Sequence, residues 1–378
     1  MPISLSGRYA LQGSQCRAGL ECYAADVNGA GGIFVREAGR RLPIELRICD
    51  DRSDGATARA LTEQLIREEV DLLFGPYGSG ITAEVARVAE QHRRLLWNHG
   101  GAGAAPGADS PWAVCILTPA SRYFRGLLDL CKARDLGLRR VVLLHATTGF
   151  ATAVAEGALA WAEREGISLS THAYQSGTED LTAHLRGAVR EPPDVLLGVG
   201  RIEDDLRLAG AILLLRPSVK AVGLVAAGIA RFQQALGADA EGFFAPTQWE
   251  AAARYQVNCG PSAAEFAQRY GAMAAVPLDY PAAQAYAAGV VAQRCIEDAG
   301  SLDQAALRAA AERCRATTFY GDFAIDPATG RQTAHSMLVV QWQGGRKVIV
   351  WPPEFAEADP ICPGPFITPG CNSGSSEA

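Results

Sequence analysis

Short apolar runs alternate with helical patterns from residue 14 to residue 246, and this alternation limits the fold more than any other feature of the sequence. Such runs are typical of strands buried on both faces of a parallel sheet, with the helices as crossovers. The predicted strands cover 44–49, 71–74, 94–97, 113–117, 141–145, 168–174, 195–199, 219–225 and 242–246, and the predicted helices 14–27, 57–69, 82–91, 121–136, 149–165, 180–190, 203–215 and 229–236. The pattern predicts an α/β fold with two doubly wound sheets in tandem.

The rest of the chain changes character. Three helical patterns follow one another with no apolar run between them, so they have to cover a sheet that is already formed. Three strand-like runs joined by turn residues then predict antiparallel strands. The helical patterns cover 261–275, 281–299 and 303–313, and the runs cover 318–325, 336–342 and 347–351. From Pro352 onward, proline, glycine and serine indicate an extended tail.

Length and charge restrict the class of protein. The 378 residues exceed the roughly 250–300 residues at which single cores stop growing, so two domains are expected. The 41 acidic and 35 basic residues give a formal charge of −6 without a block of like charges, which makes nucleic acid a poor partner. The longest apolar runs, such as 209–215, are well short of the ~18 residues of a membrane span, so direct membrane insertion is not expected. The ten cysteines and six histidines lack metal-site spacing, and we predict no cofactor and no metal.

Two glycine-rich turns follow neighbouring predicted strands. The first, within 72–82, exposes backbone N–H groups and the hydroxyl of Ser79 at the start of a helix, where an anion can be held without a basic side chain. The second is Asn98-His99-Gly100-Gly101-Ala102. Adjacent parallel strands would bring both turns to one sheet edge, where open α/β sheets bind ligands. The alternative is an ordinary turn in which Ser79 caps the helix.

Several segments together resemble the type I periplasmic solute-binding proteins of the branched-chain amino acid ABC transporter group. These segments are Leu5-Ser6-Gly7, residues 26–33, Gly75-Pro76 with Ser79, residues 98–101, residues 280–286 and residues 318–321. The resemblance implies two Rossmann-like lobes joined by three crossover strands, which close by a hinge over a small ligand in the cleft between them. It places residues 1–117 and 248–326 in the first lobe, 118–247 and 327–352 in the second, and 353–378 in the tail.

The resemblance also implies a set of ligand-binding residues. The carboxylate site of the family falls on Ser79 and on the backbone of His99, Gly100 and Gly101, and Gln12 takes a position at the edge of the ligand. Phe150 and Arg201 match ligand-facing positions of the second lobe, and Tyr280 matches an aromatic that packs on the ligand. Tyr77 and Tyr123 are further candidates for an apolar slot.

One departure from the family affects the expected ligand. Members that bind α-amino acids have an acidic residue in the turn before the helix at 229, where this chain has Val225-Ala226-Ala227-Gly228. Glu203, Asp204 or Asp205 could substitute, although acids at a helix start commonly offset its dipole. Arg201 offers a planar fork suited to a carboxylate. We therefore expect a carboxylate with an aromatic or branched body and without an essential ammonium.

The function implied by the resemblance is the substrate-binding component of an ABC importer, with a membrane permease as partner and a periplasmic or extracellular location. A ligand-sensing regulator with the same fold, binding amides or amino acids, is the alternative, and it would keep a cytoplasmic location open because no export signal precedes the first strand. An enzyme is not expected. Gly78-Ser79-Gly80 lacks the spacing of a nucleophile elbow, and Glu203 stands where a dinucleotide fingerprint beginning at Gly198 needs its third glycine.

Overall fold

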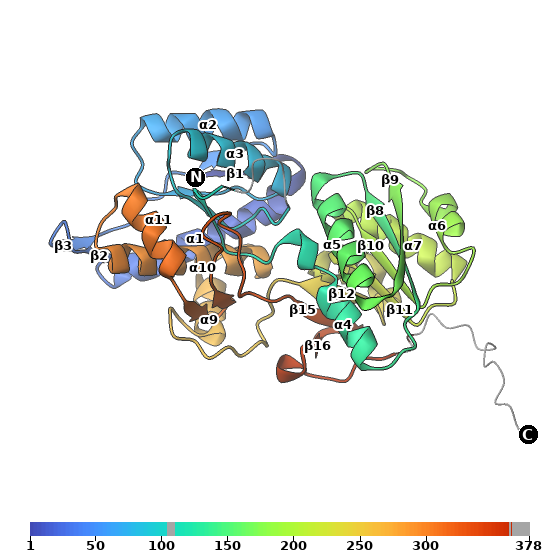
Figure 1. Cartoon of the computed structure of the whole chain (residues 1–378). Coiled ribbons are helices and arrows are strands. Elements are labelled where there is room, and N and C mark those ends of the chain that lie inside the picture. Colours follow the sequence, from blue (N-terminus) through green and yellow to red (C-terminus); the bar gives the residue numbers. More distant parts are fainter. Residues whose placement is uncertain (104–109, 363, 365–378) are drawn as a thin grey trace, which may run out of the picture. The chain divides into compact units, whose positions relative to one another are not determined.

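The computed structural model describes residues 1–103, 110–362 and 364. They form two compact units, one made of Met1–Ala120 with Gln248–Ser336 and the other of Ser121–Thr247 with the chain from Met337 onward. Figure 1 labels the helices and strands of both. The α/β class with two doubly wound units is confirmed. Residues 327–336 pack with the first unit, whereas the sequence analysis assigned them to the second lobe.

The first unit contains a parallel sheet of three strands in the order β5-β6-β7, a parallel pair β1-β4, and two antiparallel hairpins, β2-β3 and β13-β14. Its strands are β1 (Pro2–Ile3), β2 (Ile33–Val35), β3 (Arg40–Leu42), β4 (Cys49–Asp50), β5 (Leu73–Phe74), β6 (Leu96–Asn98), β7 (Ala113–Cys115), β13 (Ala316–Thr318) and β14 (Gly321–Phe323). Its helices are α1 (Ala10–Gly29), α2 (Gly55–Arg67), α3 (Ser79–Gln91), α9 (Ala263–Met273), α10 (Tyr280–Ala299) and α11 (Gln304–Arg313).

The second unit is built on one seven-stranded sheet in the order β16-β15-β12-β11-β10-β8-β9. Strands β8 to β12 are parallel, and β15 is antiparallel to both of its neighbours, β12 and β16. Its strands are β8 (Arg140–Ala146), β9 (Ser168–Tyr174), β10 (Val195–Val199), β11 (Ala221–Leu224), β12 (Phe244–Thr247), β15 (Leu338–Gln343) and β16 (Arg346–Trp351). Its helices are α4 (Arg125–Ala133), α5 (Gly149–Glu165), α6 (Thr182–Ala188), α7 (Ile202–Leu215) and α8 (Ala230–Leu236). Strands β10 and β11 are buried throughout, as their continuous apolar sequences predict.

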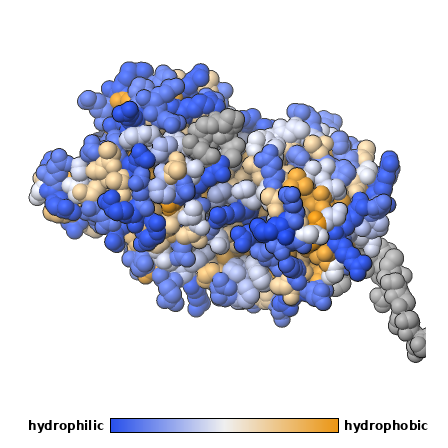
Figure 2. Space-filling model, in the orientation of Figure 1, coloured by the Kyte–Doolittle hydropathy of each residue, from blue (hydrophilic) through white to orange (hydrophobic). Residues whose placement is uncertain are grey.

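Local sequence signals set the helix starts. The Asp54 carboxylate accepts the Thr57 N–H at the start of α2, and Asp303 accepts the Ala306 N–H at the start of α11. Ser262 and Glu265 form a reciprocal capping box before α9. Hydrophilic residues cover much of the face of each unit seen in Figure 2. No helix among the described residues is both long enough and apolar enough to cross a membrane.

Two predicted strands were wrong, and one hairpin was missed. The run 318–325 was expected to be one strand, but it contains the turn at 319–320 between β13 and β14. The run 44–49 was expected to be a strand, but only Cys49 and Asp50 pair, with β1. The hairpin β2-β3 was not anticipated, because glycines 29, 31 and 32 indicate a helix stop and the turn around Gly39 lacks a hairpin dipeptide.

Helices α1 and α10 pack against each other through small residues. A Cβ added at Gly19 of α1 would lie 2.2 Å from the carbonyl oxygen of Ala282, so only glycine lets the two backbones approach this closely. Further along, a Cβ at Gly289 of α10 would lie 2.3 Å from the ring of Tyr23. Most of α10 is buried as a result, and its alanines form the middle of the core of the first unit.

The chain passes between the units after Ala120, Thr247 and Ser336. Within the first unit, one hydrogen-bonded cluster joins the three segments that lead to these points. The Thr118 N–H and C=O both bond to the side chain of Gln248 at 3.1 Å. The Thr118 hydroxyl lies 2.5 Å from Nδ1 of His335, whose Nε2 lies 3.1 Å from the carbonyl oxygen of Tyr320. Because a carbonyl only accepts, Nε2 carries the ring proton and Nδ1 accepts from Thr118.

The helix contact predicts a specific sensitivity. Gly19→Ala should destabilise the protein by about 1–3 kcal/mol, because the new methyl group overlaps the backbone of α10. Gly29→Ala, at the end of the same helix, has nothing within 4 Å of its added methyl group and serves as the matched control. Urea denaturation followed by circular dichroism measures both. Equal midpoints for the two variants would contradict the contact.

The buried histidine of the cluster predicts a pH dependence. Burial lowers the pKa of His335 from 6.5 to about 4. The unfolded chain therefore binds a proton that the folded chain excludes, so this contribution to stability is complete above pH ~6.5 and is lost as the pH falls toward about 4, by up to about 3 kcal/mol. His335→Gln should flatten the fall in unfolding free energy across this window, whereas His→Gln at the exposed His92 should not. An unchanged slope in His335→Gln would refute the assignment.

Candidate functional site

The two glycine-rich turns of the first unit lie against each other. The Gly78 N–H donates to the carbonyl oxygen of Gly100 at 2.9 Å. A Cβ at Gly100 would lie 2.3 Å from the carbonyl oxygen of Pro76, so a side chain there would push the turns apart. Gly78 itself has a φ of 97°, which a residue with a side chain rarely adopts. The expectation that neighbouring strands β5 and β6 bring both turns to one sheet edge is met.

The second turn is held from within by Asn98, at the end of β6. Its side-chain oxygen accepts the N–H groups of Gly100 and Gly101 at 3.2 and 2.9 Å, and its side-chain nitrogen donates to the Gly101 carbonyl at 2.9 Å. These two backbone N–H groups, which the sequence analysis assigned to the ligand, are thus already engaged. The role of Asn98 was not anticipated, although an asparagine bonding to the backbone two residues on is a known turn signature.

Ser79 is the first residue of α3. The residue at the N-cap position is Gly78, so the alternative in which Ser79 caps the helix is wrong. Its hydroxyl oxygen accepts the Gly103 N–H at 2.9 Å, and no acceptor for its own proton occurs among the described residues. The first intrahelical bond runs from the Thr82 N–H to the Gly78 carbonyl, so the three preceding N–H groups are those that helix geometry leaves without a partner. A half-buried hydroxyl and these N–H groups form a donor-rich surface.

Aromatic side chains surround the first turn. The hydroxyl groups of Tyr77 and Tyr280 lie 2.6 Å apart, and the rings of Tyr9 and Tyr77 meet edge to face at 5.7 Å. The structure therefore brings together two residues proposed from the sequence and adds Tyr9, which the sequence analysis missed. Gln12 is half-buried in the first turn of α1, the helix that follows Tyr9.

The side chain of His99 lies inside the unit. Its ring is fully buried beside Phe74, with 6.5 Å between the ring centres, and neither ring nitrogen has a partner among the described residues. Burial lowers the pKa of His99 to about 3, so the ring is neutral. Only the backbone of this residue remains as a candidate for ligand contact, as the sequence analysis proposed.

The candidate residues of the second unit follow neighbouring strands. Phe150 comes after β8, in the first turn of α5, and its ring meets that of Tyr123 edge to face at 5.1 Å. Arg201 follows β10, which pairs with β8, and stands exposed at the N-cap of α7. Strand β8 lies between β9 and β10, so this edge is the topological switch point of the sheet, where open α/β folds bind ligands.

The three acidic residues at the start of α7 are engaged inside the second unit. Asp204 is buried and accepts from the Ser176 hydroxyl at 2.7 Å and from the Gly177 N–H at 2.8 Å. Asp205 is fully buried and accepts the Ala226 N–H at 2.8 Å, and burial raises its pKa to about 8. Exposed Glu203 lies 3.5 Å from Arg231. Both aspartates thus fix loops of the unit that carries them.

A family model described as a periplasmic binding protein matches residues 1–347. A leucine-binding protein LivK from Thermotoga maritima has a similar structure, with a TM-score of 0.77, 18% identity and coverage of 92% of this chain and 96% of that chain. The substrate-binding protein LivJ of Streptococcus pneumoniae in complex with isoleucine has a TM-score of 0.75 and 18% identity, with coverage of 93% of this chain and 98% of that chain. An ABC transporter solute-binding protein from R. palustris in complex with 4-hydroxybenzoate has a TM-score of 0.74 and 18% identity, with coverage of 92% of this chain and 93% of that chain.

The geometry of the first turn predicts that Ser79→Ala weakens carboxylate binding by about 1–3 kcal/mol, because one donor to a charged acceptor is removed. Ser168→Ala changes the first residue of β9 in the second unit and is the control. This variant should bind the carboxylate with the same affinity as the unaltered protein. Isothermal titration with a carboxylate found by screening measures both, and circular dichroism checks the fold. Unaltered affinity in Ser79→Ala would remove this hydroxyl from the site.

Proposed function

We propose that this chain, which belongs to the periplasmic binding protein family, is the substrate-binding component of an ABC importer that captures a small carboxylate solute. The observation that carries the proposal is the interlocked pair of turns, which presents the Ser79 hydroxyl and the first N–H groups of α3 and contains no arginine or lysine of its own. Donors fixed in this way bind an acid group at low entropic cost, because the turn is already ordered. No catalytic step is part of the proposal.

The proposed ligand has an aromatic or branched apolar body and no essential ammonium group. No acid stands in the turn at 225–228, and the carboxyl groups of Asp204 and Asp205 are buried on backbone partners. A buried ammonium without a carboxylate would carry a desolvation cost of several kcal/mol, enough to remove most of a micromolar affinity of about 8 kcal/mol. Similar structures were solved with isoleucine, benzoate and 4-hydroxybenzoate. The residues of this chain favour a ligand of the benzoate kind.

The ligand-contacting residues in this proposal keep those expected from the sequence. They are Gln12, Tyr77, Ser79, the backbone of His99, Gly100 and Gly101, Tyr123, Phe150, Arg201 and Tyr280. The bonds from Gly100 and Gly101 to Asn98 assign these two residues the role of shaping the turn, with the direct donors coming from the start of α3. Arg201 supplies an exposed guanidinium group for the acid, and the aromatic rings supply an apolar surface.

The rest of the proposal follows from family membership. The two units close around the ligand by a hinge, the closed form delivers the ligand to a membrane permease, and the protein works in the periplasm or outside the cell. ATP hydrolysis takes place on other chains of the transporter.

A thermal-shift screen tests this function. We expect 3-phenylpropionate and 4-methylpentanoate to raise the melting temperature more than phenylalanine and leucine, the amino acids that share their carbon skeletons. A ligand at ~100 times its dissociation constant stabilises the folded chain by about 2.7 kcal/mol. Arg201→Gln should reduce the shift, and Arg186→Gln, an exposed arginine of α6, serves as the control. If the amino acids bind tightly and their deaminated analogues do not, an acid of the protein pairs the ammonium group, and this ligand class is overturned.

A further inference from the structure

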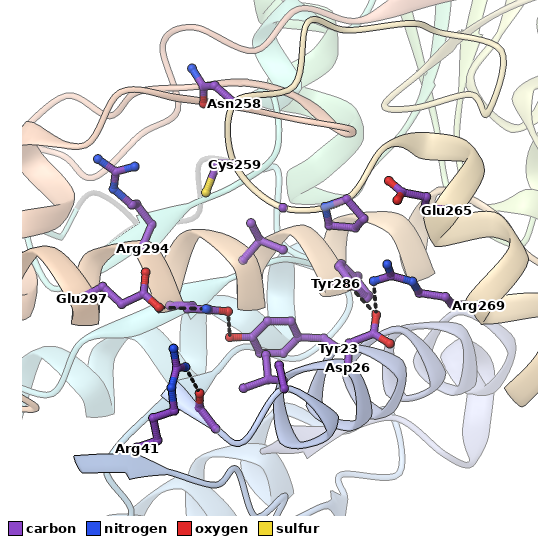
Figure 3. A pocket seen from close by; sticks show the side chains of 17 residues that line it. Tyr23, Asp26, Arg41, Asn258, Cys259, Glu265, Arg269, Tyr286, Arg294 and Glu297 are labelled. Carbon is purple, nitrogen blue, oxygen red and sulfur yellow. Dashed lines mark hydrogen bonds and ion pairs between the residues drawn. The ribbon is translucent and has the colours of Figure 1, made fainter. Parts of the chain in front are cut away.

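A cavity of about 540 Å³ lies in the first unit, along the later halves of α1 and α10. Its volume falls within the range of small-molecule sites, roughly 300–1,000 Å³. The floor includes Tyr23, Val27 and Val290, and the loop at 258–261 covers it from the other side. Figure 3 shows the charged side chains around it, with Asp26 and Arg269 near one end and Arg41, Arg294 and Glu297 near the other.

The backbone is shaped to leave this space. Gly289 lets the Tyr23 ring lie directly on α10, since a Cβ there would come within 2.3 Å of the ring. The loop above adopts a φ of 83° at Gly260, and its path is fixed by the N–H groups of Asn258 and Cys259, which both donate to the Thr317 carbonyl. The cavity therefore has a rigid floor and an anchored cover.

The carboxylates that line the cavity already have protein partners. Asp26 accepts from the Tyr286 hydroxyl at 2.6 Å and from Arg269 at 3.1 Å. Glu265 accepts from the Ser262 N–H and hydroxyl. Glu297 accepts from Gln293, whose side-chain oxygen in turn accepts from the Tyr23 hydroxyl. Each of the three carboxylates thus already has a protein donor on one of its oxygens.

The arginines at one end keep most of their donors. Arg41 bonds through one terminal nitrogen to the Gly32 carbonyl at 2.7 Å. Arg294 bonds through Nε to Asp298 at 2.9 Å. No other partner for either guanidinium group occurs among the described residues, so each has several N–H donors left. This end of the cavity has a surplus of donors, and such a surplus suits an acid group.

We propose that this cavity binds a small organic anion, a carboxylate or a phosphate monoester, with its acid group on Arg41 and Arg294 and its body over Tyr23 and Val290. This site is separate from the one at the turns. The hydroxyl group of Tyr280 reaches Tyr77 at the start of α10, and between Tyr280 and Gln293 the helix rises by roughly 20 Å. The inference does not depend on the proposed function.

Isothermal titration with AMP, citrate and adenosine tests the proposal. AMP and citrate provide the two kinds of acid group, and adenosine is AMP without its phosphate. We expect at least one of the two anions to bind at millimolar concentration or below and adenosine not to bind. Arg294→Gln should lower the affinity for the anion about tenfold, which is the effect of losing one charge-assisted hydrogen bond.

The chain offers a closely matched control. Arg17 on α1 forms the same kind of helical ion pair, with Glu21 at 2.7 Å, and its side chain is 46% exposed against 48% for Arg294, but it does not line the cavity. Arg17→Gln should leave anion binding unchanged. Ser79→Ala should also leave it unchanged, which separates this site from the one at the turns.

A second measurement is local to the cavity. Cys259 lines the wall, so the bound anion should slow its labelling by a maleimide, followed by peptide mass spectrometry, while labelling of Cys49 should not change. The proposal is overturned if neither anion binds, if adenosine binds as well as AMP, if Arg17→Gln weakens binding as much as Arg294→Gln, if Ser79→Ala abolishes it, or if Cys259 labelling is unaffected by a bound anion.

Discussion

The close contact between α1 and α10 is the constraint on which the first unit depends. Gly19 places one backbone against the other at Ala282, and the alanines that follow keep the two helices in contact. This one contact sets the positions of two groups of side chains. At one end of the pair, Tyr280 contacts Tyr77 of the first ligand turn, and at the other, Tyr23 and Gln293 line the cavity. A shift of either helix would move both sets of side chains at once.

The candidate site is pre-formed by bonds that involve no ligand. The side-chain amide of Asn98 forms hydrogen bonds within the second turn, and the Gly78 N–H donates to that turn and so joins it to the first. Because these groups are satisfied before binding, the loop entropy is lost on folding and not on ligand capture. The donors that remain, at Ser79 and the start of α3, are those that geometry cannot satisfy internally.

Much of this architecture was predictable, because strand and helix patterns in an α/β chain are locally encoded. Strand β10 and helix α5 begin and end where the sequence places them, since continuous apolar runs and caps such as Thr148 are unambiguous. The predicted strand 44–49 was wrong, because a strand needs a pairing partner and β1 pairs with only two residues there, Cys49 and Asp50. Tyr9 could not be assigned from spacing, since its role arises from a contact with Tyr77, far away in the chain. Asn98 was missed although its bonds to Gly100 and Gly101 are local, a turn signature that the sequence does carry. The cavity is a tertiary feature and leaves no pattern in the sequence.

The interlocked turns also have an evolutionary consequence. Their backbone path is fixed by glycines, by main-chain bonds and by Asn98, and the side chains of Tyr77 and Ser79 add contacts to Tyr280 and Gly103. Substitutions at 77 and 79 can therefore alter ligand preference while the glycines, main-chain bonds and Asn98 still define the turns. The fold itself persists in structures that share about a fifth of their residues with this chain.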